Sequence, residues 1–488
     1  MFRDTRFLRR AGVIFVAGLV AAGGMFSGVE ARVRQPASAN DIESIRFLSP
    51  NNIPVKVLVV YSPNQQNQNF VISLINIVAR MHEKGMVKQE DAFKVHIIPG
   101  WEMQEKDYAF INEKIGAERV KRFVEFNKAY NTRDMWMQDW GEVGVVTVKG
   151  ERKPQTVVFD SNRGRDNAEL PGILANFWSC YLIKNPSTRN SGGDYGGNIE
   201  VTPDNVLLIG NTSTPELRSF LEKHGYRNRM AVLETDWLQV GHVDEYISVC
   251  PNPKALRGYT LIKANPRLAL RLVKDTPDSE LRAIPQKEYR DAMLAVKKCL
   301  VEAEKKRAEA LKLDAPARRR RTRSFGEAVL EYLESSEELL VSSDSGTNLT
   351  YGHEIAKSDV EKFIELNLTL ARLIDSNVKS ACDKISEVRK DSGKPHSVLS
   401  FPALFRRMHG DKHIAYLPGS VNQLILNNQL IVPDPKVRSM RLHISKTAAK
   451  VGLHANFIDS LPYHNLQGQL HCGTNVFRHP NKYYVKPR

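Results

Sequence analysis

The sequence predicts an α/β protein, and two observations lead to this fold class. From about residue 55 to residue 266, short β-favouring runs recur between Gly, Pro and Asn residues, with helical stretches between them. From about residue 279 to residue 385 the chain is instead rich in Glu, Lys and Ala, with apolar residues at helical spacing. A chain of 488 residues with 42% hydrophobic content can bury a large core, and its length alone would allow two or three domains.

The first 31 residues have the pattern of a cleaved secretory signal peptide. Four arginines lie within residues 1–10, an apolar, Gly-rich stretch covers residues 11–26, and small residues suited to a signal peptidase end at residue 31. The apolar stretch is short for a membrane span, and no later segment reaches that length. We therefore expect a secreted or periplasmic protein that is soluble after cleavage. An uncleaved membrane anchor and a cytoplasmic location are the alternatives.

After the signal, residues 32–50 are expected to form a polar linker and residues 51–488 the folded region. The clearest predicted strands cover residues 55–61, 145–148, 156–159 and 206–209. Residues 279–385 are expected to form a helical excursion. Its apolar residues at helical spacing are Val360, Phe363, Ile364, Leu366, Leu370, Leu373 and Ile374.

The chain carries a formal net charge of +15, which by itself is compatible with a nucleic-acid or anionic partner. Much of the excess lies in residues 305–307 and 317–323, inside the helical excursion. No helix-turn-helix, zinc-finger or RNA-recognition pattern accompanies these runs. We therefore expect a solvated basic loop and no requirement for nucleic acid, with nuclear import or polyanion binding as the alternative.

One cysteine stands in a segment typical of a nucleophile turn. Residues 468–475 read Gly-Gln-Leu-His-Cys-Gly-Thr-Asn, which places Cys472 between a histidine and a glycine. A preceding His, small neighbours and nearby backbone N–H groups favour the thiolate, the form of cysteine that attacks carbon. A buried cysteine that only packs is the alternative. The chain has five cysteines and no C-x-x-C pair, so at least one thiol stays unpaired within the chain.

Two further segments supply groups that complement a planar cation. His242 and Asp244 lie two residues apart in a β-favouring run, and this spacing places both side chains on one face. Asp139 stands among aromatic and sulfur-bearing neighbours in residues 131–142. Each carboxylate could accept two parallel N–H bonds from a guanidinium. For each residue taken singly, a surface acid or a satisfied core histidine is the alternative.

These segments resemble, in this order, those of the protein-arginine deiminases. The catalytic domains of that family carry segments similar to W-M-Q-D, V-G-H-V-D-E and H-C-G-T-N, which here are residues 136–139, 240–245 and 471–475. The resemblance extends to residues 160–165, 197–201, 415–426 and 430–433. Each short motif alone is weak, but seven ordered segments are very unlikely to arise by chance.

The resemblance implies a fold and an activity. The fold is a five-bladed, pseudo-symmetric α/β propeller, the pentein fold, with its active site on the axis and residues 279–385 as a helical insertion. The activity is that of a hydrolase whose catalytic domain, residues 51–488, converts peptidyl arginine in protein or peptide substrates to peptidyl citrulline and ammonia. By resemblance, Asp139 and Asp244 orient the guanidinium. Cys472 attacks its carbon, and His242 protonates the departing ammonia and then activates water on the thiouronium intermediate.

Other activities share this set of residues. A deiminase or an amidinotransferase acting on free arginine or agmatine is the alternative within enzymes. A non-catalytic secreted binding protein on the same scaffold is the alternative outside enzymes, and the joint presence of the four catalytic residues argues against it.

Three residues are implied by the resemblance to bind substrate: Arg163, Arg165 and Trp136. Arginines matching Arg163 and Arg165 hold substrate backbone carbonyls in the family, which favours peptidyl over free arginine. An arginine side chain has only donors and so suits a carbonyl. An exposed salt-bridging pair is the alternative for the two arginines.

The resemblance also implies calcium as a cofactor. Gln138, Glu142 and Glu200 match side-chain ligands of one calcium site in the family, to which backbone carbonyls of Gly196 and Ile199 would be added. Calcium takes six or more oxygen ligands, and this set supplies hard donors. A neighbouring second site keeps Asp160 and Ser161 but has Trp140 and Gly164 in place of two ligands. We therefore expect one working site rather than full calcium cooperativity.

Overall fold

Strands and helices alternate in the computed structural model, which describes residues 39–166, 168–311 and 357–486. The chain divides into two units, residues 1–32 and 33–488, and the described residues all belong to the second. The predicted signal peptide and the basic run at residues 317–323 lie outside the described residues.

The elements have the following bounds. The strands are β1 (Ile42–Phe47), β2 (Asn52–Tyr61), β3 (Lys94–Pro99), β4 (Val124–Phe126), β5 (Gly141–Val148), β6 (Gln155–Asp160), β7 (Tyr181–Lys184), β8 (Ile199–Val201), β9 (Leu207–Gly210), β10 (Met230–Leu233), β11 (Ile247–Pro251), β12 (Tyr259–Asn265), β13 (Val398–Pro402), β14 (Phe405–Arg407), β15 (His413–Ala415), β16 (Leu424–Leu426), β17 (Gln429–Pro433), β18 (His454–Ile458) and β19 (Thr474–Tyr483). The α-helices are α1 (Gln68–Glu83), α2 (Glu105–Ile115), α3 (Ala117–Phe123), α4 (Leu170–Phe177), α5 (Pro215–Leu221), α6 (Pro266–Asp275), α7 (Asp278–Arg282), α8 (Lys287–Leu311), α11 (Lys357–Arg389), α12 (Arg438–Lys450) and α13 (Leu461–His464).

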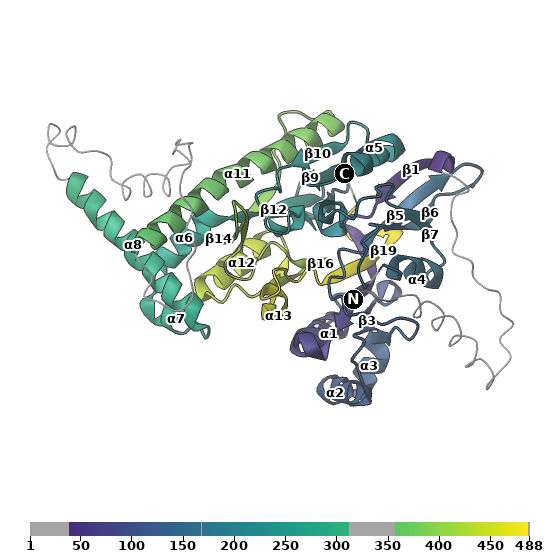
Figure 1. Ribbon diagram of the computed structural model, residues 1–488, viewed down its shortest axis with the longest axis horizontal. Coiled ribbons are helices and arrows are strands. Elements are labelled where there is room, and N and C mark those ends of the chain that lie inside the picture. The colour runs from purple at the N-terminus through teal and green to yellow at the C-terminus, as the bar shows by residue number, and fades with distance from the viewer. Residues whose placement is uncertain (1–38, 167, 312–356, 487–488) are drawn as a thin grey trace, which may run out of the picture. The chain divides into compact units, whose positions relative to one another are not determined.

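The fold is mixed α/β, and its strands form small separate sheets (Figure 1). Within the described residues the strand orders are β1-β5-β6-β7, β10-β9-β8, β11-β12-β13, β14-β15, β16-β17-β18 and β19-β2-β3-β4. No closed sheet is found among them. The predicted α/β class is confirmed, whereas the five-bladed closed arrangement stays a prediction.

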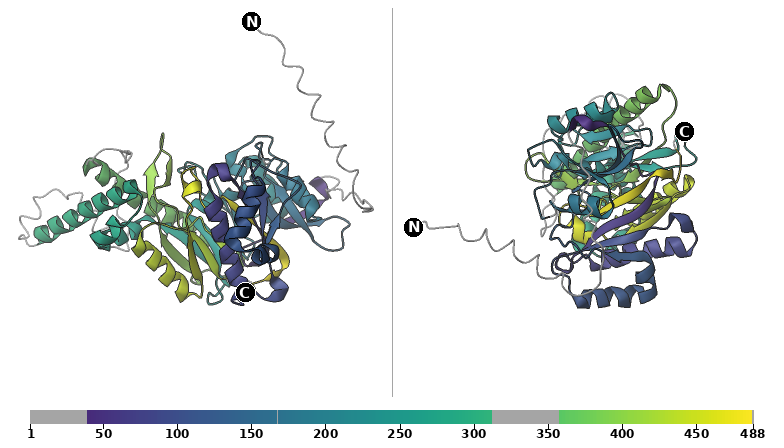
Figure 2. Two further views of the ribbon diagram at one scale, coloured as in Figure 1. Left: turned by 90° about the horizontal axis from the view of Figure 1, so that it is seen from below. Right: turned by 90° about the vertical axis from the view of Figure 1, so that its right-hand side faces the viewer.

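One connection recurs five times among the described residues. Two antiparallel strands are followed by a helical crossover to a third strand, which pairs in parallel with the second. A parallel pair needs such a crossover, because its two strands run in the same direction. The five units are β5-β6-α4-β7, β8-β9-α5-β10, β11-β12 with α6, α7, α8 and α11 before β13, β16-β17-α12-β18, and β19-β2-α1-β3. The last unit joins the C-terminal strand β19 to β2 near the other end of the chain (Figure 2).

The predicted helical excursion is confirmed over its described residues. Helices α7, α8 and α11 lie between β12 and β13, and α11 packs along α8 and α6 (Figure 1). The predicted apolar residues face the core: Phe363 and Ile364 lie in one buried cluster, Leu370 and Ile374 in a second, and Leu366 and Leu373 are partly buried beside the second. One helix therefore packs into two cores of the same unit.

Two predictions of local structure are wrong. Residues 42–47, placed in a linker, form β1, which pairs antiparallel with β5. Ile42, Ile45 and Phe47 are buried, and the polar residues between them hid this pattern. The run around His242 is not a strand, because residues Val243–Glu245 form a short 3-10 turn with His242 as its N-cap.

Within the described residues, no helix combines the length and the apolar character needed to cross a membrane. All five cysteines are free thiols. Cys180, Cys250, Cys299 and Cys472 are buried and Cys382 is half-buried.

Candidate active site

The four residues predicted to be catalytic come from three loops that each precede a strand. Asp139 lies just before β5, His242 and Asp244 just before β11, and Cys472 just before β19. Two of these loops touch through the backbone, because the Gln138 N–H donates to the Cys472 carbonyl over 3.1 Å. Gly141 ends the Asp139 loop at φ +151°, where a methyl group would lie 2.0 Å from the Phe159 carbonyl oxygen. Only glycine fits there.

The two carboxylates each have one oxygen engaged and one unpaired. Asp139 Oδ2 accepts from Arg163 Nη1 at 2.8 Å, and Asp244 Oδ2 lies 2.8 Å from His471 Nδ1. Asp139 Oδ1 and Asp244 Oδ1 are buried without a hydrogen-bond partner among the described residues. In this structure each carboxylate thus has one oxygen available to a ligand, and a fork of two bonds from a guanidinium to each carboxylate stays a prediction. Together the two carboxylates still offer two oxygens to one guanidinium.

His242 is oriented by a backbone carbonyl. Its Nε2 lies 2.8 Å from the Gly192 carbonyl oxygen, which can only accept, so Nε2 carries the proton. Nδ1 has no hydrogen-bond partner among the described residues and lies 3.7 Å from Asp139 Oδ1. A methyl group on Gly197 would lie 2.5 Å from His242 Nδ1 and 3.2 Å from Asp244 Oδ2. The two side chains therefore face one point, as predicted, although a turn rather than a strand places them.

Cys472 is buried, and its sulfur lies between a donor and an acceptor. Asn422 Nδ2 donates to Sγ over 3.2 Å, and Sγ lies 3.7 Å from Asp244 Oδ2. Burial and the negative charges of Asp244 and Asp139 raise the pKa of the Cys472 thiol well above its usual value. His471 faces Asp244 instead of the sulfur. The expectation that the preceding histidine favours the thiolate is therefore wrong for the free site.

Two residues of the site were not predicted. His471 was considered only as a neighbour of the cysteine, yet it forms an ion pair with Asp244. Burial lowers the pKa of His471, but the hydrogen bond and charge of Asp244 outweigh burial, so its pKa is raised. Asn422 stood only inside a matched segment. No local pattern around residue 422 indicates a contact with a residue fifty positions away.

The predicted substrate-binding residues divide into buried and exposed ones. Arg163 is 2% exposed and forms ion pairs with Asp134 and Asp139 at 2.9 and 2.8 Å. Its guanidinium is thus occupied in this structure, whereas Arg165 is exposed. Trp136 is half-buried and packs its ring against Gly468 of the cysteine loop. Arg165 and Trp136 also line an open pocket of about 370 Å³, together with Gln65, Arg133, Asp134, Met135 and Asp166.

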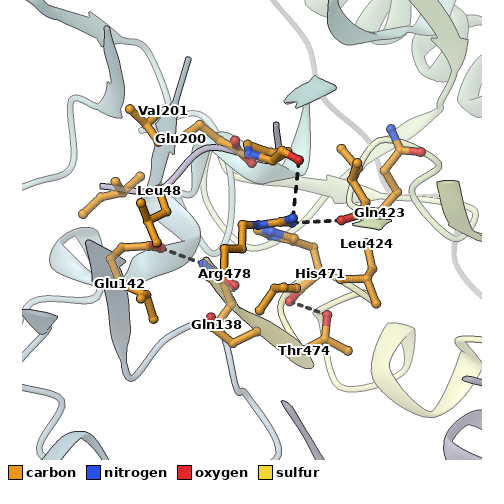
Figure 3. Close-up of a pocket in the computed structure, with 16 residues that line it drawn as sticks. Leu48, Gln138, Glu142, Glu200, Val201, Gln423, Leu424, His471, Thr474 and Arg478 are labelled. Atoms are coloured by element: carbon orange, nitrogen blue, oxygen red, sulfur yellow. Dashed lines mark hydrogen bonds between the residues drawn. The ribbon is translucent and has the colours of Figure 1, made fainter. Parts of the chain in front are cut away.

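Most of the candidate calcium ligands line one small cavity beside the site. The cavity, of about 60 Å³, is lined by Gln138, Glu142, Ile199 and Glu200, and Gln138 Nε2 donates to Glu142 Oε1 over 2.7 Å (Figure 3). A methyl group on Gly196 would lie 2.8 Å from Glu142 Oε1, which places its backbone against this group. Asp160 does not line the cavity, and its Oδ1 accepts from the Asn162 N–H at 2.8 Å. Trp140, where the second site would need an acid, is fully buried.

The charges in this cavity suit a cation. Burial raises the pKa of Glu200 to about 7, and burial with the charge of Glu200 raises the pKa of Glu142 well above its usual range. Burial lowers the pKa of Arg478 to about 10, and its guanidinium donates hydrogen bonds to the carbonyls of Asn52 and Ile425. Two buried carboxylates that repel each other, with an amide oxygen beside them, fit a hard divalent ion. No three His, Cys, Asp or Glu side chains converge on a metal position in the part of the chain that the structure describes.

Comparisons with known proteins agree on one family. The sequence profile of the protein-arginine deiminase family matches residues 47–484. Human protein-arginine deiminase type-3 is 27% identical over 72% of this chain and 48% of its own length. Human protein-arginine deiminase type-4 is 27% identical over 72% of this chain and 47% of its own length. The chain thus spans about half the length of the curated relatives it matches.

Solved structures of agmatine deiminases are also similar, at lower sequence identity. The enzyme of C. jejuni has a TM-score of 0.48 at 13% identity, covering 89% of this chain and 97% of its own. The enzyme of Enterococcus faecalis has a TM-score of 0.42 at 11% identity, covering 92% of this chain and 99% of its own.

Proposed function

Because the chain belongs to the protein-arginine deiminase family, we propose that it hydrolyses peptidyl arginine to peptidyl citrulline and ammonia. One observation carries the proposal. The unpaired atoms Asp139 Oδ1, Asp244 Oδ1 and His242 Nδ1 are buried in the same site as the Cys472 thiol. Buried polar atoms without partners are rare in folded proteins and are expected where a ligand completes them. Two acceptors and one base beside a thiol suit a guanidinium.

Substrate binding follows from the charges. The two carboxylates that raise the pKa of the Cys472 thiol are neutralised when a guanidinium cation binds them. The thiol then loses its proton more easily, so the nucleophile is formed with the substrate in place. Asp139 and Asp244 act as anionic acceptors that fix the orientation of the guanidinium carbon before Cys472.

The chemistry then needs an attack, a leaving group and water. His242 Nδ1 takes the proton of the Cys472 thiol as the sulfur forms a bond to the guanidinium carbon, and one C–N bond then breaks as ammonia leaves with that proton from His242. Water, deprotonated by His242, then attacks the S-alkyl thiouronium carbon and the C–S bond breaks, which releases citrulline and restores the thiol. The Gly192 carbonyl holds the imidazole so that Nδ1 can serve both steps.

The open pocket outside the site supports a peptidyl substrate. Trp136 and Arg165 line it, and Asp134 in its wall pairs with Arg163 beside Asp139. A free arginine or agmatine would leave this space unfilled, whereas the residues flanking a peptidyl arginine would occupy it. Arg165 is the residue available to hold a backbone carbonyl there.

We extend the proposal to the fold, calcium and location. The five recurring units support the pseudo-fivefold pentein arrangement. Calcium would be held by Gln138, Glu142 and Glu200 with carbonyls of Gly196 and Ile199, and it would offset their charge beside the cysteine loop. The charged and apolar pattern of residues 1–31 supports export. N-terminal sequencing of the exported protein would test the last point, and a retained residue 1 would contradict it.

The decisive experiment measures citrulline formation from an arginine-containing peptide, free arginine and agmatine, each with calcium and with chelator. We expect turnover of the peptide and much less of the other two. Cys472→Ser is the control, because a hydroxyl is nearly isosteric but far less nucleophilic. Preference for free arginine or agmatine would establish the alternative enzyme. No citrulline from any substrate by the folded protein would favour a non-catalytic role.

A further inference from the structure

Asn422 holds the reactive cysteine by three contacts at once. The residue is 1% exposed. Its Oδ1 accepts from the backbone N–H of His471 at 2.9 Å and of Cys472 at 3.3 Å, and its Nδ2 lies 3.2 Å from Cys472 Sγ. Nδ2 also lies 3.4 Å from the Asp244 carbonyl oxygen. The side chain therefore joins the Asp244 loop to the cysteine loop.

The orientation of the amide follows from its partners. Backbone N–H groups can only donate, so the atom facing the His471 and Cys472 amides must be the oxygen. The nitrogen then faces the sulfur, and because an NH₂ group can only donate, the sulfur must accept. The Asp244 carbonyl, which also can only accept, requires the same orientation.

The topology gives Asn422 the same place as two residues of the site. Asn422, Asp139 and Cys472 each lie two residues before the first strand of a recurring unit, which are β16, β5 and β19. Asp244 lies three residues before β11. The loops before these first strands thus deliver the side chains of the site, and the unit that begins at β16 delivers an amide donor.

We propose that Asn422 is a further catalytic residue, whose N–H donor stabilises negative charge on the Cys472 sulfur. The carboxylates of Asp244 and Asp139 oppose this charge, and no other side-chain N–H among the described residues donates to Sγ. The donor acts when the sulfur attacks and again when the C–S bond breaks. Its role in turnover rests on the proposed deiminase function, whereas its effect on the reactivity of the thiol does not.

The test follows alkylation of Cys472 by iodoacetamide at one pH, resolved from the other thiols by mass spectrometry. Asn422→Ala removes the contacts, and Asn422→Asp keeps an oxygen for the two backbone amides but has no N–H for the sulfur. Because each variant loses a hydrogen bond to a charged group, we expect the alkylation of Cys472 to be about 10- to 100-fold slower in both. Asn367→Ala is the matched control, because Asn367 is buried and bonded to backbone of Phe363 and Phe405 away from the cysteine. Its alkylation rate should equal that of the parent.

The outcomes separate this inference from the proposed function. If Asn422→Asp reacts as fast as the parent protein, Asn422 only anchors the loop and the proposal is overturned. If Asn422→Ala fails to fold by circular dichroism, Asn422→Asp alone decides. Slow alkylation in a protein that forms no citrulline from any substrate would retain the inference and reject the deiminase function. If the parent protein is active, the kcat of the Asn422 variants should fall in parallel with their rate of Cys472 alkylation, while their KM changes little.

Discussion

At the scale of single residues, charge balance decides what the site can bind. Arg163 holds Asp139 Oδ2 and pairs with Asp134, so it leaves Asp139 with one free oxygen beside His242. Burial raises the pKa of Asp139, and the charges of His242 and Arg163 oppose this effect. Arg163 therefore contributes to a charged Asp139 from inside the protein, whereas the exposed Arg165 can contact only what lies outside the site.

This difference predicts that the two arginines affect different substrates. Arg165→Gln should raise KM for a peptide by about 10-fold, as expected for one lost charge-assisted hydrogen bond, and leave a single-residue arginine derivative unaffected. Arg163→Lys should raise KM for both, because it disturbs the orientation of Asp139. Steady-state kinetics on the two substrates measures the split. Equal effects of Arg165→Gln on both substrates would show that Arg165 does not contact the peptide.

A second residue-scale prediction concerns Glu200 and pH in the absence of calcium. The pKa of Glu200 is raised from 4.5 to about 7 by burial, so the folded protein binds the proton more tightly than the unfolded chain. Stability is therefore lost as pH rises from about 4.5 through about 7, by roughly 3 kcal/mol. Glu200→Gln should match the parent near pH 4 and be the more stable protein at pH 8 in urea unfolding. Glu43→Gln, an exposed acid in β1, is the control, and an identical pH profile for Glu200→Gln would contradict the shift.

At the scale of elements, the cysteine loop depends on two glycines that lie against aromatic rings. A methyl group on Gly468 would lie 2.1 Å from Trp136 Cζ3, and one on Gly473 would lie 2.1 Å from Tyr463 Cε1. Neither ring can move freely, since Trp136 and Tyr463 also contact each other edge to face. The loop that presents Cys472 is thus fixed by packing as well as by the hydrogen bonds of Asn422.

Substitution of either glycine should therefore displace the cysteine loop. Gly468→Ala and Gly473→Ala should each cost about 1 to 3 kcal/mol of stability through overpacking and lower kcat/KM by more than about 10-fold. Gly172→Ala in α4 is the matched control, because its nearest neighbour, Leu182 Cδ2, would be 3.8 Å away. Thermal unfolding and citrulline assays measure both effects. Normal activity in Gly468→Ala would show that the loop tolerates a displaced Trp136.

At the scale of the whole molecule, the sequence predicted what is local or carried by a motif. The strand at residues 55–61 and the helical stripe of α11 follow from spacing, and both are found. Asp139, His242, Asp244 and Cys472 come from separate loops that the fold brings together. The hydrogen-bond partners of these site residues could not be predicted from the sequence. Arg163, His471 and Asn422 reach them through tertiary contacts across long sequence separations. β1 was missed because its exposed positions are polar and its pairing partner, β5, lies a hundred residues away.

Calcium gives the prediction that involves the whole molecule, because the candidate cavity is lined by strands β5, β8, β16 and β19 and by residues just before β5, β16 and β19. An ion at concentration c that binds only the folded, ordered state stabilises it by RT ln(1 + c/Kd), so the stabilisation grows with the logarithm of the ion concentration above Kd. At pH 8, calcium should therefore raise the melting temperature and the activity together. The dependence should be close to first order, because Trp140 is buried where a second site would need an acid.

Two variants separate this cavity from the second candidate site. Glu200→Gln should shift the calcium response to higher concentration without changing activity at saturating ion, whereas Asp160→Asn should leave the response unchanged, because Asp160 does not line the cavity. Calcium titrations followed by melting temperature and by citrulline formation measure both responses. Full activity in chelator with no calcium-dependent change in melting temperature would establish Glu142 and Glu200 as ordinary buried acids. A steep curve that Asp160→Asn flattens would instead establish a second bound ion near β6, despite Trp140.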